Sequence, residues 1–243
     1  MTQTREGTSL LERIERVRAM IREAAQRSSR SPDEITLVAV SKTHPIKAIQ
    51  DALSEGLTDF GENRVQEAET KIPVIGREKA KWHLIGHLQS NKARRAVELF
   101  DVIHSLDSAP LAQRLDRMCE EVNRPTLPVL IQVDLGHEAT KTGVAEGELP
   151  EVVTTVQGCH RLQLIGLMTL PPFFEKSEGV RPYFRRLREL RDELRTSGAF
   201  GDRGGELSMG MTHDFEIAIE EGATIVRVGT AIFGEREVAV ARP

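Results

Sequence analysis

Eight short apolar runs are spaced along the 243 residues of the chain, and a helix-like segment follows most of them. Most of the runs are continuous and rich in β-branched residues, which is typical of parallel strands buried on both faces. Alternation of such strands with helices predicts a parallel sheet whose crossover connections are helical. The runs span residues 35–40, 57–61, 82–86, 102–106, 127–135, 162–170, 205–211 and 224–234.

The segments between the runs carry apolar residues at helical spacing. A further helix is expected before the first run, over residues 8–28, where Thr8 or Ser9 can serve as the N-cap. The intervening helical segments span residues 48–53, 62–71, 90–99, 108–122, 147–157, 182–197 and 212–222.

Eight strand–helix units in a chain of this length fit a (β/α)8 barrel, also called a TIM barrel, better than a six-stranded open sheet. A doubly wound open sheet is the alternative. Too few residues follow the last run to form another helix, so we expect the N-terminal helix at 8–28 to close the ring there. No Gly/Ser-rich linker divides the sequence, and residues 1–243 are therefore expected to form a single domain.

Composition and charge narrow the classes of function. The 33 lysines and arginines and 37 aspartates and glutamates give a net charge of −4, which offers no basic surface for a nucleic acid. No apolar run approaches the length of about 18 residues of a membrane span, and the N-terminus lacks the apolar core of a signal peptide. Cys119 and Cys159 form no CxxC motif, so we expect no thiolate metal site. These features predict a reduced, cytoplasmic protein.

Functional residues of (β/α)8 barrels lie at the carboxyl ends of the strands and in the loops after them. Polar or soft side chains at these positions are therefore candidates for the site. They include Lys42 after the first run, Asn63 after the second, His83 in the third, Met168 in the sixth and Ser208 in the seventh.

Lys42 directly follows the first apolar run, ITLVAVS. At the end of a buried strand, desolvation favours the neutral amine over the ammonium ion. A neutral amine can attack a carbonyl carbon and form a Schiff base. The alternative is an ordinary lysine whose charged end extends into solvent.

The sequence SMGMTHD, at the end of the seventh run, suits a phosphate group. Gly210 allows close approach of the backbone, and the N–H groups of a helix opening near Thr212 would face an anion. Arg227 and Gly229 follow on the next strand, and such barrels often bind phosphate between the loops after strands seven and eight. The alternative is an ordinary helix cap with Arg227 in a salt bridge. A Schiff-base lysine beside a phosphate site favours pyridoxal 5′-phosphate (PLP), which has both an aldehyde and a phosphate.

Six sequence blocks, in order along the chain, resemble the YggS/PROSC family of pyridoxal phosphate homeostasis proteins. The resemblance extends from about residue 8 to residue 236. The blocks are AVSKTHP (39–45), FGENRVQE (60–67), WHLIGHLQSNK (82–92), GLMTLPP (166–172), LSMGMTHDFEIAI (207–219) and VRVGTAIFG (226–234).

This resemblance implies a barrel like the N-terminal domain of bacterial alanine racemase, with PLP held as an internal aldimine on Lys42. It implies that the phosphate is bound by Met211, Thr212, Gly229 and Thr230. The family commonly has serine where this chain has Thr212, and the hydroxyl is retained.

Further family positions surround the cofactor. Arg227 is implied to lie beside it, facing either the ring nitrogen or the phosphate. Asn63 and His83 match positions that line the pocket, and Lys141 matches a lysine proposed to assist cofactor exchange.

Two classes of function follow from these features. The first is a monomeric PLP carrier, without catalytic activity of its own, that supplies the cofactor to apo forms of PLP-dependent enzymes. The alternative is an amino-acid racemase, which needs an acid/base group on each face of the substrate α-carbon. Lys42 could serve one face, but the only tyrosine is Tyr183, near the start of a predicted helix, and no sequence for a second domain precedes the end at Pro243. A barrel that binds no cofactor is the third possibility. We therefore expect the carrier.

Overall fold

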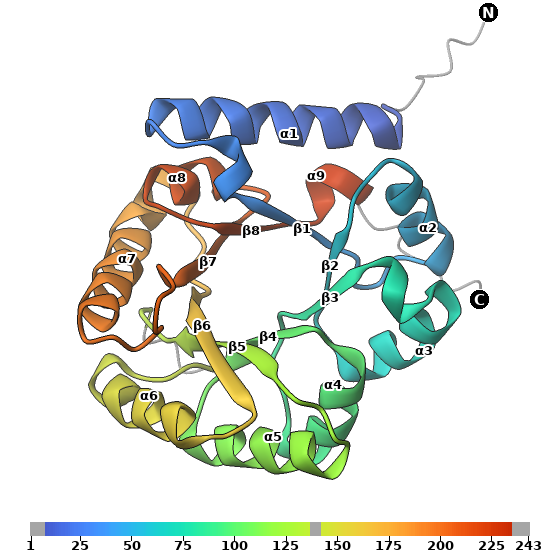
Figure 1. Cartoon of the computed structure of the whole chain (residues 1–243). Coiled ribbons are helices and arrows are strands. Elements are labelled where there is room, and N and C mark those ends of the chain that lie inside the picture. Colours follow the sequence, from blue (N-terminus) through green and yellow to red (C-terminus); the bar gives the residue numbers. More distant parts are fainter. Residues whose placement is uncertain (1–7, 137–141, 235–243) are drawn as a thin grey trace, which may run out of the picture.

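The computed structural model describes residues 8–136 and 142–234. Eight parallel strands form a closed barrel in chain order, and β8 pairs with β1 to complete the ring (Figure 1). This confirms the (β/α)8 barrel and excludes the open sheet. The strands are β1 (Thr36–Val40), β2 (Asp59–Glu62), β3 (Lys81–Leu84), β4 (Val102–Leu106), β5 (Leu127–Val133), β6 (Leu162–Thr169), β7 (Glu206–Met211) and β8 (Ile225–Val228).

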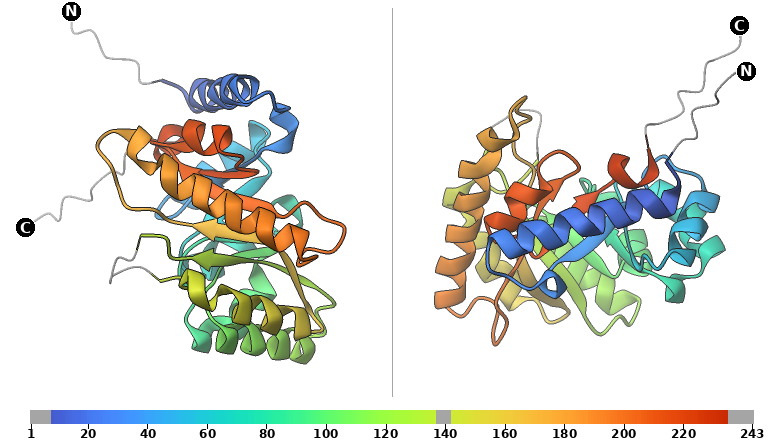
Figure 2. Two further views of the ribbon diagram at one scale, coloured as in Figure 1. Left: turned by 90° about the vertical axis from the view of Figure 1, so that its left-hand side faces the viewer. Right: turned by 90° about the horizontal axis from the view of Figure 1, so that it is seen from above.

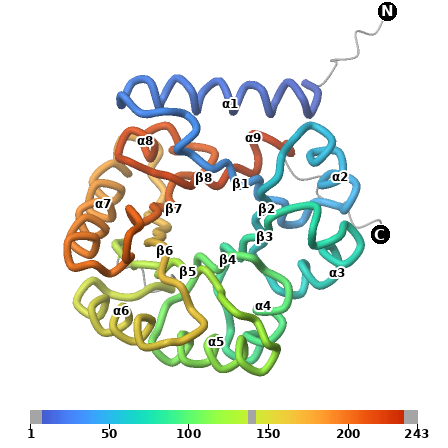
Figure 3. The backbone as a smooth tube through the Cα atoms, viewed as in Figure 1, coloured from blue at the N-terminus to red at the C-terminus, as the bar shows by residue number. Residues whose placement is uncertain are grey.

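Helices surround the barrel and cover the outer face of its strands (Figure 3). They are α1 (Leu10–Arg27), α2 (Ile46–Ser54), α3 (Val65–Ile75), α4 (Ala93–Leu99), α5 (Ala109–Glu121), α6 (Leu149–Gly158), α7 (Arg181–Thr196), α8 (Phe215–Glu220) and α9 (Thr230–Phe233). Short 3-10 turns occupy Pro32–Glu34, Arg77–Lys79, Ser90–Lys92, Glu146–Glu148 and Ser177–Val180. In the part of the chain that the structure describes, no helix is long and apolar enough to cross a membrane.

Helix α1 closes the ring on its outer side, as expected. Ser9 caps it and forms a reciprocal capping box with Glu12. Its buried face packs on α8 and α9 (Figure 2). The Arg27 guanidinium forms ion pairs with Glu216 and Glu220 of α8, at 2.9 and 2.8 Å. The N-terminal helix therefore joins the last elements of the barrel to the first.

One expectation about the C-terminal elements was wrong. A one-turn helix, α9, follows β8, although the sequence was expected to leave no room for one. Helix α8 spans Phe215–Glu220 with Asp214 as its N-cap and so lies inside the expected segment 212–222; before it, residues 211–214 form a turn in which the Asp214 backbone N–H donates to the Met211 carbonyl.

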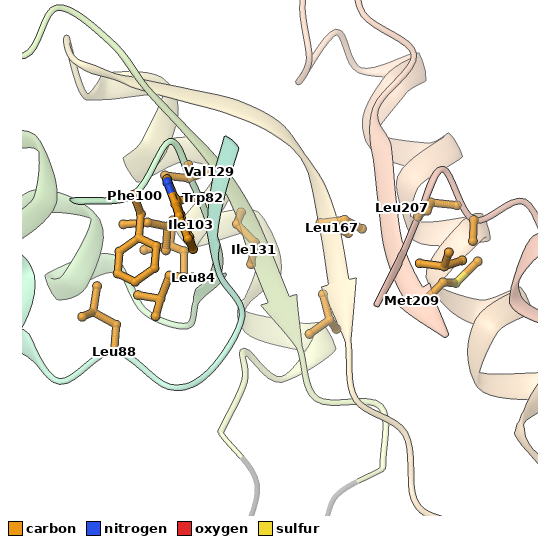
Figure 4. Packing of buried hydrophobic residues seen from close by; sticks show 14 of the residues in the cluster. Trp82, Leu84, Leu88, Phe100, Ile103, Val129, Ile131, Leu167, Leu207 and Met209 are labelled. Carbon is orange, nitrogen blue, oxygen red and sulfur yellow. The ribbon is translucent and has the colours of Figure 1, made fainter. Parts of the chain in front are cut away.

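Side chains alternate between the outside and the inside of the barrel along each strand. Those that point outward pack against the helices and form the main core, in which Trp82, Leu84, Phe100 and Ile103 lie together (Figure 4). Those that point inward form a small separate apolar cluster of Val38, Val102, Leu130, Met168 and Ile225. The remaining interior is occupied by polar side chains, and these lead to the site.

Candidate functional site

A cavity of about 750 Å³ opens at the carboxyl ends of the strands. Because β8 pairs with β1, the end of β1 and the loops after β7 and β8 share this cavity. Seven of the ten residues predicted to bind a cofactor line its wall: Lys42, Asn63, Met211, Thr212, Arg227, Gly229 and Thr230.

The other three predicted residues lie below the wall of the cavity. His83 is 1% exposed, and Met168 and Ser208 are fully buried inside the barrel. The structure therefore does not bring these three side chains to the cavity surface. Lys141, which was expected to assist exchange, lies outside the described residues.

A buried polar network holds the backbone on both sides of Lys42. The Ser41 hydroxyl donates to Glu62 Oε1 at 2.7 Å, and Lys71 Nζ donates to the same oxygen at 2.7 Å and to the Ser41 carbonyl at 2.9 Å. On the other side, the Thr43 backbone N–H donates to Glu67 Oε2 at 2.8 Å. We call Ser41, Glu62, Glu67 and Lys71 the outer network, because they lie between the strands and the helices.

The electrostatics of the outer network are set by burial. The Glu62 side chain is fully buried and that of Lys71 is 8% exposed. Burial raises the pKa of Glu62 above its usual value, although the hydrogen bond from Lys71 opposes this. Removing one partner of such a buried pair leaves an uncompensated charge, so each partner depends on the other.

The loops after β7 and β8 meet at the far wall of the cavity. The Gly229 backbone N–H donates to the Thr212 hydroxyl at 3.4 Å, which joins the two loops. Gly210 has φ +90°, and a Cβ there would lie 2.5 Å from Ala218 Cβ, so only glycine fits this turn. The Met211 N–H donates to Asp214 Oδ1 at 2.6 Å. The expected free N–H groups of a helix opening at Thr212 are therefore replaced by two loops that present hydroxyl and main-chain groups.

Arg227 reaches the cavity from inside the barrel. Its side chain is 2% exposed, and its Nη atoms donate to Ser208 Oγ at 2.6 Å and to the Thr169 carbonyl at 2.9 Å. Burial lowers the pKa of Arg227 to about 10, so the guanidinium stays protonated at neutral pH. The expected salt-bridge alternative is not what holds this residue, since both described partners are uncharged oxygens. The side chain therefore places a fixed positive charge at the cavity wall.

Sequence reasoning missed several residues of the cavity wall. Gln132, from β5, donates through Nε2 to the Thr142 carbonyl and lines the cavity beside it. His87 and His213 also line the wall; His87 contacts Asp107 at 3.0 Å, and the His213 ring lies 5.5 Å from that of Phe173. Gln132 could have been found from the sequence, because it is the one amide side chain within the apolar run LPVLIQV.

Among residues 8–136 and 142–234, no group of three or more histidine, cysteine, aspartate or glutamate side chains is arranged to hold an ion. The cavity instead combines a primary amine, hydroxyls, a guanidinium and apolar walls from Val40, Ile85 and Leu170.

Comparison with known proteins defines the class. Residues 13–237 match the family model for the alanine racemase N-terminal domain. The alanine racemase of Corynebacterium glutamicum shares this fold at 19% identity and a TM-score of 0.67, over 96% of this chain and 64% of the other. The chain is thus a barrel of the alanine racemase N-terminal type.

Relatives with higher sequence identity show to which family within this class the chain belongs. A pyridoxal phosphate homeostasis protein of Aquifex aeolicus is 44% identical over 93% of this chain and 98% of its own length. That of Escherichia coli K12 is 43% identical over 92% and 95%. PipY of Synechococcus elongatus PCC7942, solved with PLP bound, is 38% identical, with a TM-score of 0.78 over 93% of this chain and all of that one. The chain belongs to the family of pyridoxal phosphate homeostasis proteins.

Proposed function

We propose that this chain binds PLP in the cavity at the carboxyl ends of the strands and maintains the supply of PLP by delivering it to apo-enzymes. The observation that carries the proposal is the shared cavity, which Lys42 lines together with Thr212, Gly229 and Thr230. The donor set fits PLP, because it offers an amine for an aldehyde and hydroxyl and main-chain groups for a phosphate. The relatives' names and the PLP-bound PipY support it.

Each part of the cavity has a role in this proposal. When bound, PLP supplies an aldehyde that reacts reversibly with primary amines. Lys42 provides the amine, and the outer network fixes the backbone from which it extends. The loops after β7 and β8 bind the phosphate through Thr212, Gly229 and Thr230. Val40 and Ile85 would give the ring an apolar wall that excludes water from it.

Arg227 contributes a charge that does not titrate near neutral pH. A guanidinium presents donors only and accepts no hydrogen bond. Facing either the ring nitrogen or the phosphate, it would stabilise an unprotonated or anionic partner. Facing the ring nitrogen, it would leave that nitrogen unprotonated and make the ring a poorer electron sink.

Tyr183, the tyrosine considered for the racemase alternative, does not line the cavity. The ring of Tyr183, in α7, packs on Phe174 at a centroid distance of 5.7 Å. We therefore favour delivery over racemisation. In this proposal residues 1–243 act as one domain and as a monomer, in the cytoplasm, where newly made apo-enzymes are found.

The test combines trapping and transfer. Purified chain is incubated with PLP, reduced with borohydride and mapped by mass spectrometry, and we expect the label on Lys42. Lys42→Ala should lose the absorbance of the bound cofactor. Lys47→Ala, at an exposed lysine of α2 paired only with Asp51, is the matched control.

Two further measurements decide the function. Loaded protein should activate an apo-enzyme acceptor faster than its own spontaneous loss of PLP would allow. Label on another lysine, or none, would refute the site. Interconversion of D- and L-alanine above a blank with PLP alone would favour the racemase.

A further inference from the structure

A chain of hydrogen bonds crosses the interior of the barrel, from the cavity to the opposite end. Arg227 Nη1 lies 2.6 Å from Ser208 Oγ, and Ser208 Oγ lies 2.8 Å from His104 Nδ1. His104 Nε2 lies 2.8 Å from His83 Nδ1, and His83 Nε2 lies 3.0 Å from Asp59 Oδ1. We call these five residues the inner chain. They come from five different strands, β8, β7, β4, β3 and β2.

The two ends of the inner chain lie in different surroundings. Arg227, Ser208, His104 and His83 are at most 2% exposed. Asp59 is the first residue of β2, so it lies at the amino end of the barrel, away from the cavity. Its side chain is 17% exposed. The inner chain therefore connects the cavity wall with solvent at the other end of the barrel.

The chemistry of the end groups fixes the direction of every link. A guanidinium only donates hydrogen bonds, and a carboxylate only accepts them. Each of the four links needs one proton, and Ser208, His104 and His83 each have one to give when the imidazoles are neutral. All donors therefore point towards Asp59, and both imidazoles carry their proton on Nε2.

An additional proton on His83 would place two N–H groups face to face at its link with His104, and an additional proton on His104 would deprive the Ser208 hydroxyl of its acceptor. Burial lowers the pKa of both His83 and His104, in agreement with neutral rings. Burial alone would raise the pKa of Asp59, but hydrogen bonds from His83 and Thr58 outweigh it and lower the pKa.

Other charged groups near the inner chain do not reverse the direction of its hydrogen bonds. Lys81, at the end of the barrel where Asp59 lies, disfavours protonation of both rings. Asp101 favours a charge on His83, but its carboxylate already accepts from the Trp82 backbone N–H at 2.8 Å and from Arg77 at 3.0 Å. Asp59 is thus the group that sets the direction.

We propose that Asp59 is a positioning residue for the cavity at the other end of the barrel, acting on Arg227 through the inner chain. With the carboxylate in place, Ser208 must offer its oxygen to Arg227. Without it, the imidazoles can exchange tautomers and His104 can donate to Ser208, whose oxygen then accepts from both His104 and Arg227 while its own hydroxyl proton loses its acceptor. The consequence for PLP rests on the proposed function, whereas the direction of the chain does not.

The first experiment determines the direction of the hydrogen bonds of the inner chain, using the full-length protein without PLP. Long-range proton–nitrogen NMR of nitrogen-15-labelled protein near pH 7.5 should show His83 and His104 as neutral Nε2–H tautomers, assigned with His83→Gln and His104→Gln. Asp59→Asn, which can donate as well as accept, should populate the Nδ1–H tautomer of His83. Asp101→Asn, a carboxylate at the same end of the barrel, is the matched control and should leave both rings unchanged.

The outcomes are decisive even if a variant does not fold. A protonated ring or an Nδ1–H tautomer in the wild type would overturn the assignment without any variant. Unchanged tautomers in a folded Asp59→Asn protein would overturn the role of Asp59.

The second experiment measures PLP. If the proposed function holds, Asp59→Asn should raise the dissociation constant about tenfold, while Asp101→Asn leaves it within about twofold. Asp59→Glu, which restores a carboxylate, should recover part of the loss. Altered tautomers with unaltered PLP affinity would refute the positioning role and leave the proposed function intact. Failure of the wild type to take up PLP would instead refute the proposed function, and the NMR result would still decide the direction of the chain.

Discussion

The outer network and the inner chain are both buried and polar, and both lead to the cavity, but they are built differently. The outer network contains a full ion pair, Glu62 with Lys71, and Glu62 Oε2 has no hydrogen-bond partner among the described residues. In the inner chain every link is made, and its charged ends are separated by three neutral groups. The comparison teaches that a buried charge can be matched either by direct contact or by a directed series of neutral groups.

The two arrangements act on different parts of the site. The outer network holds backbone, around Ser41 and Thr43, and so sets where Lys42 begins. The inner chain holds a side chain, the Arg227 guanidinium. Disrupting the outer network should therefore lower the stability of the fold most, whereas disrupting the inner chain should change the cavity most.

The largest effect is expected from Lys71→Met. This change leaves Glu62 charged and unpaired in the core and should lower the free energy of unfolding by about 3–5 kcal/mol. Urea denaturation followed by circular dichroism measures it. Adding Glu62→Met to Lys71→Met should restore most of the loss, and a double variant as unstable as Lys71→Met would argue against the charge explanation.

A matched pair of serines compares the networks directly. Ser208→Ala removes an acceptor from Arg227 and a donor from His104, both of them buried, and should cost about 2–3 kcal/mol. Ser41→Ala removes one donor, while Lys71 still satisfies Glu62 Oε1, and should cost about 1 kcal/mol. Both are measured by urea denaturation, and equal costs would contradict the distinction between the two networks.

The pH dependence of stability should have opposite signs in the two networks. The pKa values of His83 and His104 are lowered by burial, whereas unfolded histidine has a pKa of about 6.5. Below that pH the unfolded chain binds more protons, so stability is full above about pH 6.5 and falls as the pH decreases, by at most about 1.4 kcal/mol per pH unit for each ring.

Glu62 behaves in the opposite way. Its pKa is raised by burial, so between the unfolded and folded pKa values the folded chain binds the extra proton and stability falls as the pH rises. Denaturation midpoints from pH 7.5 to 4.5 test both signs. His104→Gln should flatten the upper part of the profile, and Glu62→Gln should alter only the lower part; a flat wild-type profile would contradict the assignment.

The smallest effect is expected from Glu67→Gln at the edge of the outer network. The amide oxygen can still accept from the Thr43 N–H, and the contact with Lys71, at 3.3 Å, is the weaker of its two. The cost should stay below about 1 kcal/mol, as for partly exposed ion pairs. Borohydride trapping of PLP on Lys42 should proceed as in the wild type, and slower trapping would show that Glu67 does more than hold the loop.

Much of the fold could be predicted because its signals are local. The apolar runs that became β5 and β6 are long and continuous, and Ser9 with Glu12 forms a recognisable cap. Helix α9 was missed because a single turn within TIVRVGTAIFG resembles a strand end. Such short elements depend on neighbouring loops more than on their own residues.

The residues of the site at the strand ends could be predicted from the sequence, but those deeper inside the barrel could not. Lys42 and Thr212 follow their strands directly, so their place on the cavity wall follows from the fold. His83 and Ser208 were placed on the wall but lie deeper, because depth depends on the stagger between neighbouring strands, which no single run encodes. His104 and Asp59 were missed for the same reason, since only closure of the barrel brings their side chains together.

The packing of α1 has a consequence for synthesis on the ribosome. This helix is synthesised well before α8 and α9, the helices that cover its apolar face. At translation rates of roughly 5–20 residues per second, about 200 further residues take on the order of 10–40 s. During that interval the apolar face of α1 is not covered by α8 and α9. It therefore remains available for binding by chaperones until those two helices have been synthesised.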